Sequence, residues 1–268
     1  MSEIEQRRKL ALKMGGEEGI RRQHERGKLT VRERIDSLAD AGSFTQFMSM
    51  MGSAVYEGND LAQFTPRGAV EGFCRLDGRK VVLSGGDFTV RGGSGGTGGD
   101  LGMELASNRR AQEWRIPYVR LLDSSGGSVR SFEDIGRTYL PDGNVWSAID
   151  TQLLSEVPVV SAVMGSVAGL PAINACMAHF NLMVKDTSQL FPGGPPVVKA
   201  SLGYDITKEE LGGDKIHTRI SGVIDNLAQD EDDAFSQIKQ FLSYLPTNVW
   251  EAPPRTEADD DPTRSDST

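Results

Sequence analysis

The chain has 268 residues, of which 38% are hydrophobic and 7% aromatic, so it can bury the core of one large α/β domain or two small ones. Its formal charge of −9 at pH 7 argues against a nucleic-acid surface, because phosphate binding requires a basic face. There is no apolar run of about 18 residues, so we expect no membrane span. Cys74 and Cys176 are too few for a four-thiolate zinc site, and we expect no metal site. Both lie in apolar surroundings, which favours buried thiols in a reduced, cytoplasmic protein.

Residues 1–38 are predicted to form an N-terminal helical segment, rich in Glu, Arg, Lys and Leu and interrupted by glycines. Thr30 and Glu33 have the Ser/Thr-x-x-Glu spacing of a capping box, which predicts a helix from Thr30 through Leu38. The arginines of this segment could contact an anionic ligand, but a solvated helix face is the simpler interpretation. They are Arg21, Arg22, Arg26, Arg32 and Arg34.

A β-rich stretch is predicted next, with short strands at 68–71, 73–76 and 80–84 and a hairpin turn at Asp77-Gly78. The glycine-rich residues 87–100 then lead into a helix at 101–114. They superficially match a G-x-G-x-x-G fingerprint, but no mononucleotide-binding unit follows. We therefore interpret them as an anion-facing loop.

Two strand-to-glycine turns follow, and the chain is organised around them. The apolar run 118–122 stops at Asp123 and then at the paired glycines Gly126 and Gly127. Residues 158–164 repeat the layout and run into Gly165–Gly169. Without a Cβ, such turns can aim backbone N–H groups at a ligand oxygen, and two convergent donors are the minimum for an oxyanion hole. Spacing alone leaves open that both are ordinary strand-to-helix connections.

The remaining elements predict a continuing α/β pattern. We expect helices at 145–155, 169–178, 205–211 and 231–245, a further helix introduced by residues 192–196 and running through 201, and strands at 157–163, 181–184 and 189–191. Cys176, on the small-residue helix 169–178, is expected in the core. Residues 39–250 would then form the main domain, and the acidic residues 251–268 a disordered linker or tail.

Several short segments occur in an order that resembles a known family. They include Gly27–Asp36, Asp87–Val90, Ser125–Gly127, Ala168–Gly169, Met183–Ser188, Glu210–Gly213 and Leu242–Pro246, and they cover nearly the whole chain. Their order is similar to the N-terminal half of the carboxyltransferase (β) subunit of biotin-dependent acyl-CoA carboxylases, of the propionyl-CoA and acetyl-CoA carboxylase type.

The resemblance implies a single-domain, crotonase-like α/β fold of stacked ββα units. It implies that Gly126 or Gly127 supplies one oxyanion donor and Gly169 the other. These amides would hold the enolate of an acyl-CoA while its α-carbon takes CO₂ from carboxybiotin, the biotin being carried on a separate protein. The residues placed against the substrate are Ser94, Gly95, Ser125, Ser128, Ala168 and Leu170.

The sequence also departs from the family. The usual Ser-Gly-Gly-Ala-Arg-Ile reads Ser-Gly-Gly-Ser-Val-Arg at 125–130, and the usual Ala-Gly-Gly-Ala reads Ala-Gly-Leu-Pro at 168–171. Single-chain members carry a second, similar domain that binds the biotin, so we expect either a truncated piece or a hetero-oligomer. Its partners would be a C-terminal-domain carboxyltransferase subunit and a biotin carboxylase or biotin carrier subunit. A malonyl- or methylmalonyl-thioester decarboxylase subunit and a catalytically idle scaffold remain alternatives.

Overall fold

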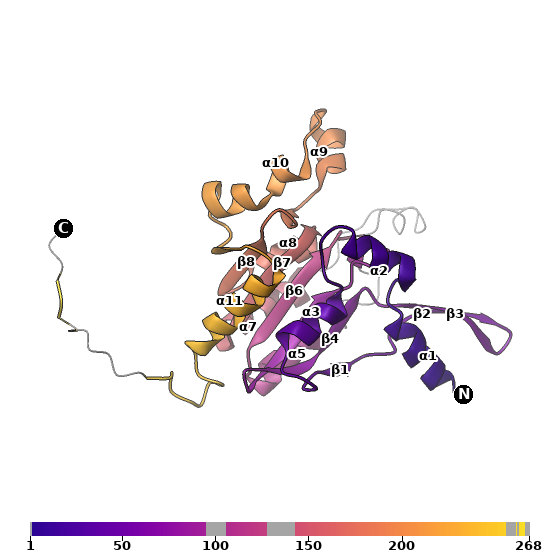
Figure 1. Cartoon of the computed structure of the whole chain (residues 1–268), viewed down its shortest axis with the longest axis horizontal. Helices are drawn as coiled ribbons and strands as arrows, with labels where there is room; N and C mark the ends of the chain where they lie inside the picture. Colours follow the sequence, from indigo (N-terminus) through magenta and orange to yellow (C-terminus); the bar gives the residue numbers. More distant parts are fainter. Residues whose placement is uncertain (1, 95–105, 128–142, 256–260, 262, 266–268) are drawn as a thin grey trace.

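The computed structural model describes residues 2–94, 106–127, 143–255, 261 and 263–265. Its centre is an eight-stranded mixed sheet with the strand order β1-β4-β5-β6-β7-β8-β10, in which β9 also pairs with β7 (Figure 1). The sheet strands are β1 (Thr45–Phe47), β4 (Ala69–Leu76), β5 (Arg79–Gly86), β6 (Tyr118–Ser124), β7 (Val159–Ala168), β8 (Phe180–Val184), β9 (Gln189–Phe191) and β10 (Asn226–Ala228). β1, β4 and β5 pair antiparallel, whereas the pairs from β5 to β10 are parallel. The predicted α/β class is confirmed.

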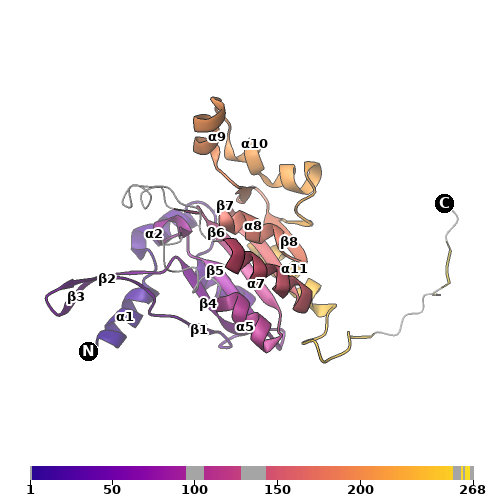
Figure 2. The ribbon, with the colours of Figure 1, turned by 180° about the vertical axis from the view of Figure 1, so that it is seen from behind.

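Helices cover both faces of this sheet, so the molecule has three layers (Figures 1 and 2). α3 (Val31–Leu38) and α11 (Glu231–Ser243) pack on one face, against side chains such as Val119 and Leu121 of β6. α5 (Ala106–Trp114) and α7 (Gly143–Glu156) pack on the other, where Tyr118 of β6 belongs to the core. The period of two along β6 therefore divides its side chains between two helix layers.

Local sequence signals account for several element boundaries. Thr30 caps α3 with both bonds of the predicted capping box, to and from Glu33. The predicted Asp77-Gly78 turn joins β4 to β5 as a hairpin. A further hairpin that the sequence analysis did not predict, β2 (Gly52–Glu57) with β3 (Asp60–Pro66), extends from the sheet beside α1 (Glu3–Leu12) (Figure 1).

Two predictions in this region are wrong. β7 does not stop before Gly165 but continues to Ala168, because Ser166–Ala168 pair with the three residues of β9. Cys176 lies at the end of α8 (Leu170–Cys176) and is exposed rather than part of the core, since Ala172 and Ala175 form the buried side of that short helix.

The remaining elements are α2 (Gly16–His24), the 3₁₀ turn η1 (Arg91–Gly93), α9 (Pro195–Leu202), α10 (Lys208–Gly212) and the π-helical turn η2 (Ile216–Ile220). α9 and α10 project beyond the end of the sheet in both views (Figures 1 and 2). Within the described ranges, none of the helices combines the length and apolarity needed to cross a membrane.

Candidate active site at the ends of β6 and β7

The two predicted glycine turns lie side by side. β6 and β7 are parallel neighbours, with Leu122 opposite Val163 and Ser124 opposite Val167, so both chains leave the sheet at the same edge. Ligands of open α/β sheets bind at such carboxyl ends. The topology therefore brings the turn after Ser124 against the turn after Val167.

The backbones of these turns are in direct contact at two glycines. Gly126 has φ +81° and Gly169 has φ +70°, a region that L side chains rarely adopt. A Cβ built on Gly126 would lie 2.6 Å from the carbonyl oxygen of Ala168 and 3.5 Å from the amide nitrogen of Gly169. A Cβ built on Gly169 would lie 3.7 Å from Gly126 Cα. Glycine at 126 is thus required both by the backbone conformation and by the close approach of the second turn.

The amides of the turns differ in what they already bind. Gly126 N–H donates to Ser124 Oγ at 3.3 Å, whereas Gly127 is exposed and a Cβ there would meet no atom within 4 Å. Gly169 N–H donates to the carbonyls of Phe191 and Pro192, at 3.3 and 3.1 Å. The predicted donor role of Gly169 would require these bonds to be exchanged for one to the substrate.

The next amide in the second turn belongs to Leu170, the first residue of α8. Ala172 and Ile173 N–H both donate to Gly169 O, at 3.0 and 3.4 Å, and Pro171 has no N–H. The Leu170 N–H is therefore the one in the first turn of α8 without an acceptor among the described residues. Leu170 was predicted to lie against the substrate, and its amide is an additional candidate donor in this turn.

A third segment packs against the first turn. Ser125 N–H donates to Gly92 O at 2.8 Å, and Ser124 Oγ donates to Gly93 O at 2.6 Å, so η1 is fastened to the end of β6. Ser94 follows directly, and its hydroxyl donates to Arg91 O at 2.8 Å. Ser94, Ser125, Ala168 and Leu170 thus belong to segments that meet at one edge of the sheet. The predicted contacts Gly95 and Ser128 lie outside the described residues.

Below the first turn is a fully buried cluster of charges around Asp123, which has no exposed surface. Its carboxylate accepts hydrogen bonds from Lys28 Nζ at 2.8 and 2.9 Å, from Arg34 Nη1 at 2.9 Å and from Gln23 Nε2 at 3.1 Å. Arg34 also binds Glu231 through two bonds of 2.7 and 2.8 Å. Burial lowers the pKa of Lys28, and the charge of Asp123 acts in the opposite direction.

The opposite face of β6 carries a second buried charge. Arg120 is 2% exposed, and its Nη2 lies 2.6 Å from Asp150 Oδ1 of α7, which also binds Asn108 of α5. Its Nη1 donates to the carbonyls of Asn174 and Met177, at 2.9 Å each, at the C-terminal end of α8. Arg120 therefore bonds to α7 and to the end of α8, and Asp150 extends this network to α5.

Sequence reasoning missed both of these networks. Arg34 was interpreted as part of a solvated helix face, and this is wrong, because it is buried between α3, β6 and α11. The available signal was a charge inside an otherwise apolar strand: Arg120 and Asp123 stand in β6, where an unpaired charge would be very costly. That cost predicts partners of opposite sign, but not which residues provide them.

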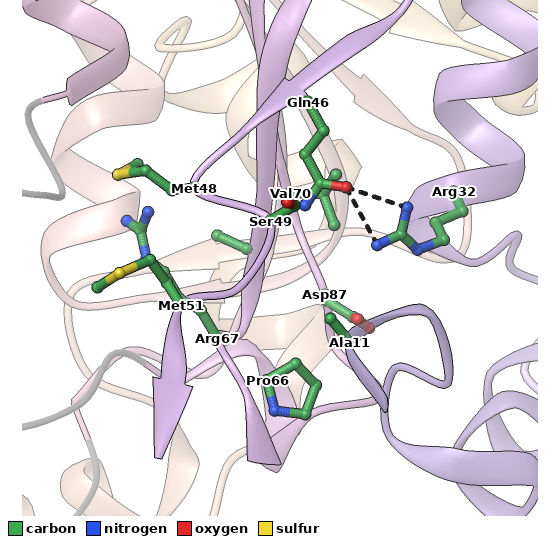
Figure 3. Close-up of a pocket in the computed structure, with 11 residues that line it drawn as sticks. Ala11, Arg32, Gln46, Met48, Ser49, Met51, Pro66, Arg67, Val70 and Asp87 are labelled. Carbon is green, nitrogen blue, oxygen red and sulfur yellow. Dashed lines mark hydrogen bonds between the residues drawn. The ribbon is translucent and has the colours of Figure 1, made fainter. Parts of the chain in front are cut away.

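A small hollow, open to solvent, is lined by residues outside the glycine turns (Figure 3). Residues of α1, α3, β1, β3 and β4 and of the connection between β1 and β2 line it, together with Asp87. Arg32 reaches across it to Gln46 Oε1, with both donor distances 3.3 Å (Figure 3). No residue of the two turns contributes to its lining, so we do not place the substrate there.

Comparison with known proteins identifies the family. Residues 22–268 match the carboxyl transferase domain, and the chain belongs to this family, which has the crotonase-like fold. It is 36% identical to the propionyl-CoA carboxylase carboxyltransferase subunit of Haloferax mediterranei, over 98% of this chain and 50% of that protein. It is 35% identical to the methylmalonyl-CoA decarboxylase subunit alpha of Veillonella parvula, over 94% of this chain and 49% of that protein.

Solved structures agree with this assignment. The transcarboxylase 12S structure with methylmalonyl-coenzyme A bound superposes with a TM-score of 0.78 and 29% identity, over 96% of this chain and 50% of that one. The chain spans about half the length of the two curated relatives named above. The resemblance stated from the sequence motifs is confirmed.

Proposed function

We propose that this chain is the acyl-CoA-binding half of an acyl-CoA carboxyltransferase. The observation that carries the proposal is the backbone contact between Gly126 and Gly169, which brings two N–H-bearing turns to one point at the sheet edge. One donor would come from the Gly126–Gly127 turn and the other from the Gly169–Leu170 turn. Two amides aimed at a thioester oxygen stabilise the enolate without reorganising, and one such donor is worth about 3 kcal/mol of activation free energy.

Among the described residues beside the turns, the carboxylate is not placed to remove a proton. Among the described residues, Asp123 is the carboxylate next to the first turn, and both of its oxygens accept hydrogen bonds from Lys28, Arg34 or Gln23. It is therefore not available as a general base, which has to come within hydrogen-bond reach of the proton. Biotin on a separate carrier would supply the CO₂ and accept the α-proton, as the resemblance implies. The described residues at the turns offer backbone donors for a thioester, and we place no biotin contact on this chain.

The remaining half of the site would come from a partner. We propose a hetero-oligomer with a C-terminal-domain carboxyltransferase subunit and with a subunit that carries biotin carboxylase or the biotin carrier. The basis is that the chain covers about half of each curated relative named above. Reconstitution with a candidate partner and a carboxylated biotinyl carrier, followed by carboxyl transfer to propionyl-CoA, tests the proposal.

A decarboxylase subunit is the second candidate, favoured by the similarity to the Veillonella parvula methylmalonyl-CoA decarboxylase subunit. The enolate intermediate is common to both directions, so the same turns would serve. The carboxyltransferase and a biotin-free decarboxylase are distinguished by supplying methylmalonyl-CoA and measuring CO₂ release with and without the biotinyl carrier. Release of CO₂ without the carrier would indicate the decarboxylase. An idle scaffold would bind no acyl-CoA, and isothermal titration with propionyl-CoA tests for this directly.

A further inference from the structure

The strand pair that carries both turns is interrupted just before they begin. Pairing of β6 with β7 passes from Leu122–Val163 to Ser124–Val167, so Asp123 alone stands opposite the three residues Met164–Ser166. Such a bulge bends the strand that carries the extra residues and locally disrupts the pairing. The geometry of this bulge therefore sets the separation at which the two chains leave the sheet.

The Lys28–Asp123 ion pair fills the bulge. A Cβ on Gly165 would lie 2.2 Å from Asp123 Oδ1 and 2.5 Å from Lys28 Nζ, so both charged groups occupy the space that a side chain would otherwise fill. Arg34 Nη2 donates to Met164 O at 2.9 Å and satisfies the carbonyl next to Gly165. The bulge is held open by charged side chains rather than by apolar packing.

Lys28 also reaches the third segment of the site. Its ammonium lies 4.6 Å from the centre of the Phe88 ring, a cation–π distance, and Phe88 precedes η1 and Ser94 in the chain. A Cβ on Gly92 would lie 3.9 Å from Phe88 and 3.0 Å from Ser125 Oγ. One buried cation, 6% exposed, thus lies against Asp123 near the end of β6, against Gly165 in the β7 bulge and against Phe88, which leads into η1.

The charges of the cluster balance. Lys28 and Arg34 contribute two positive charges, and Asp123 and Glu231 two negative charges, with Gln23 as a neutral donor. Glu231 binds Arg34 and the Leu29 N–H, so Arg34 keeps a carboxylate even without Asp123. Lys28, in contrast, has Asp123 as its one ion-pair partner among the described residues. The Lys28–Asp123 pair can therefore be removed as a neutral unit.

We propose that Lys28 is a positioning residue for the acyl-thioester site: by filling the β6–β7 bulge with Asp123, it fixes the distance between the two turns whose amides hold the thioester oxygen. This inference rests on the proposed function. Lys28 does not touch the substrate in this proposal and acts through the backbone that follows Asp123. Loss of the ammonium is expected to weaken carbonyl polarisation more than binding.

The test uses the whole chain and propionyl-CoA labelled with ¹³C at the thioester carbonyl. Infrared difference spectra report the C=O stretch of the bound ester, and isothermal titration reports its affinity and that of CoA alone. We expect the wild-type chain to lower the stretching frequency on binding. In Lys28→Met that shift should fall by at least half, with CoA affinity within twofold. Lys239→Met, which removes a solvent-accessible lysine paired with Asp77, is the control and should retain the full shift.

In the reconstituted complex, Lys28→Met should lower kcat about 10- to 100-fold with KM nearly unchanged, the pattern of a misplaced transition-state contact. If the single variant fails to fold, Lys28→Met with Asp123→Asn replaces it, because this double change leaves Arg34 paired with Glu231. A folded variant of either kind with the wild-type carbonyl shift and kcat overturns the positioning role. A wild-type chain that binds propionyl-CoA without any carbonyl shift overturns the oxyanion site itself.

Discussion

Replacing Gly126 with alanine perturbs the contact on which the proposed site depends. The substitution places a Cβ in the left-handed region, φ +81°, which costs about 1–2 kcal/mol. The same Cβ would lie 2.6 Å from Ala168 O, a backbone atom that cannot rotate away, and such overpacking costs about 1–3 kcal/mol. We therefore expect the free energy of unfolding to fall by about 2–5 kcal/mol.

Gly78→Ala is the matched control, because Gly78 also has φ +81° but has no atom within 4 Å of its Cβ position. It lies in the β4–β5 hairpin, away from both turns. Its free energy of unfolding should fall only by the cost of placing a Cβ in the left-handed region, about 1–2 kcal/mol. Urea unfolding of both variants at 25 °C isolates the contribution of the close contact between the turns.

Activity provides the second measurement. Relieving the overlap has to move one turn away from the other, and a displacement of about 1 Å at a catalytic contact costs about 100-fold in rate. Gly126→Ala in the reconstituted complex should therefore lose about 100-fold in kcat/KM, and Gly78→Ala should retain it within twofold. Equal destabilisation of the two variants would show that the turns do not touch. Full activity in a folded Gly126→Ala protein would refute the oxyanion assignment.

Three further predictions concern buried groups outside the turns. Arg120→Met should lower the free energy of unfolding by about 3–5 kcal/mol, because it leaves Asp150 buried without its cation. Arg75→Met, at an exposed position of β4, is the control and should change the free energy of unfolding by less than about 0.5 kcal/mol. Urea unfolding of both variants measures the difference. Burial raises the pKa of Glu71 above its ordinary value of 4.5, so the folded state holds that proton more tightly than the unfolded state does. The stability that this provides at low pH is lost as the pH rises through the raised pKa. Glu71→Gln should therefore reduce the fall in unfolding free energy as the pH rises above 4.5, and an unchanged fall in urea unfolding would contradict the assignment. Iodoacetamide should alkylate the exposed Cys176 in the native protein and leave Cys74 unmodified, because burial raises the pKa of Cys74 to about 12. Peptide mass spectrometry measures alkylation at both sites. Equal labelling of the two cysteines would contradict the burial of Cys74.

The sequence predicted those features that depend on local chemistry. The capping box at Thr30 and the Asp77-Gly78 hairpin both follow from hydrogen bonds or backbone angles within a few residues, and both are present. The order of strands and helices from 118 onward was also predictable, because apolar runs alternate with glycine turns. The adjacency of the two turns followed from parallel pairing, which places the ends of neighbouring strands at one edge of the sheet.

The register of β6 against β7 could not be predicted in the same way. Gly165 looked like the end of a strand, since glycine weakens strands and often starts a turn. Its actual role depends on Asp123 and Lys28, which are 42 and 137 residues away in sequence and come together only in the folded chain. A glycine that makes space for a distant side chain carries no local signature that separates it from a turn glycine.

The choice of amide donors in the second turn shows how one side chain can alter a backbone site. Because Pro171 has no N–H and Gly169 O already accepts from Ala172 and Ile173, the start of α8 offers the single amide of Leu170. The Gly169 amide faces the carbonyls of Phe191 and Pro192, where β9 ends against β7. A proline at 171 therefore narrows the second donor to two adjacent amides, one occupied and one available. The effect of this proline on an oxyanion site therefore depends on which carbonyls the neighbouring N–H groups already bind.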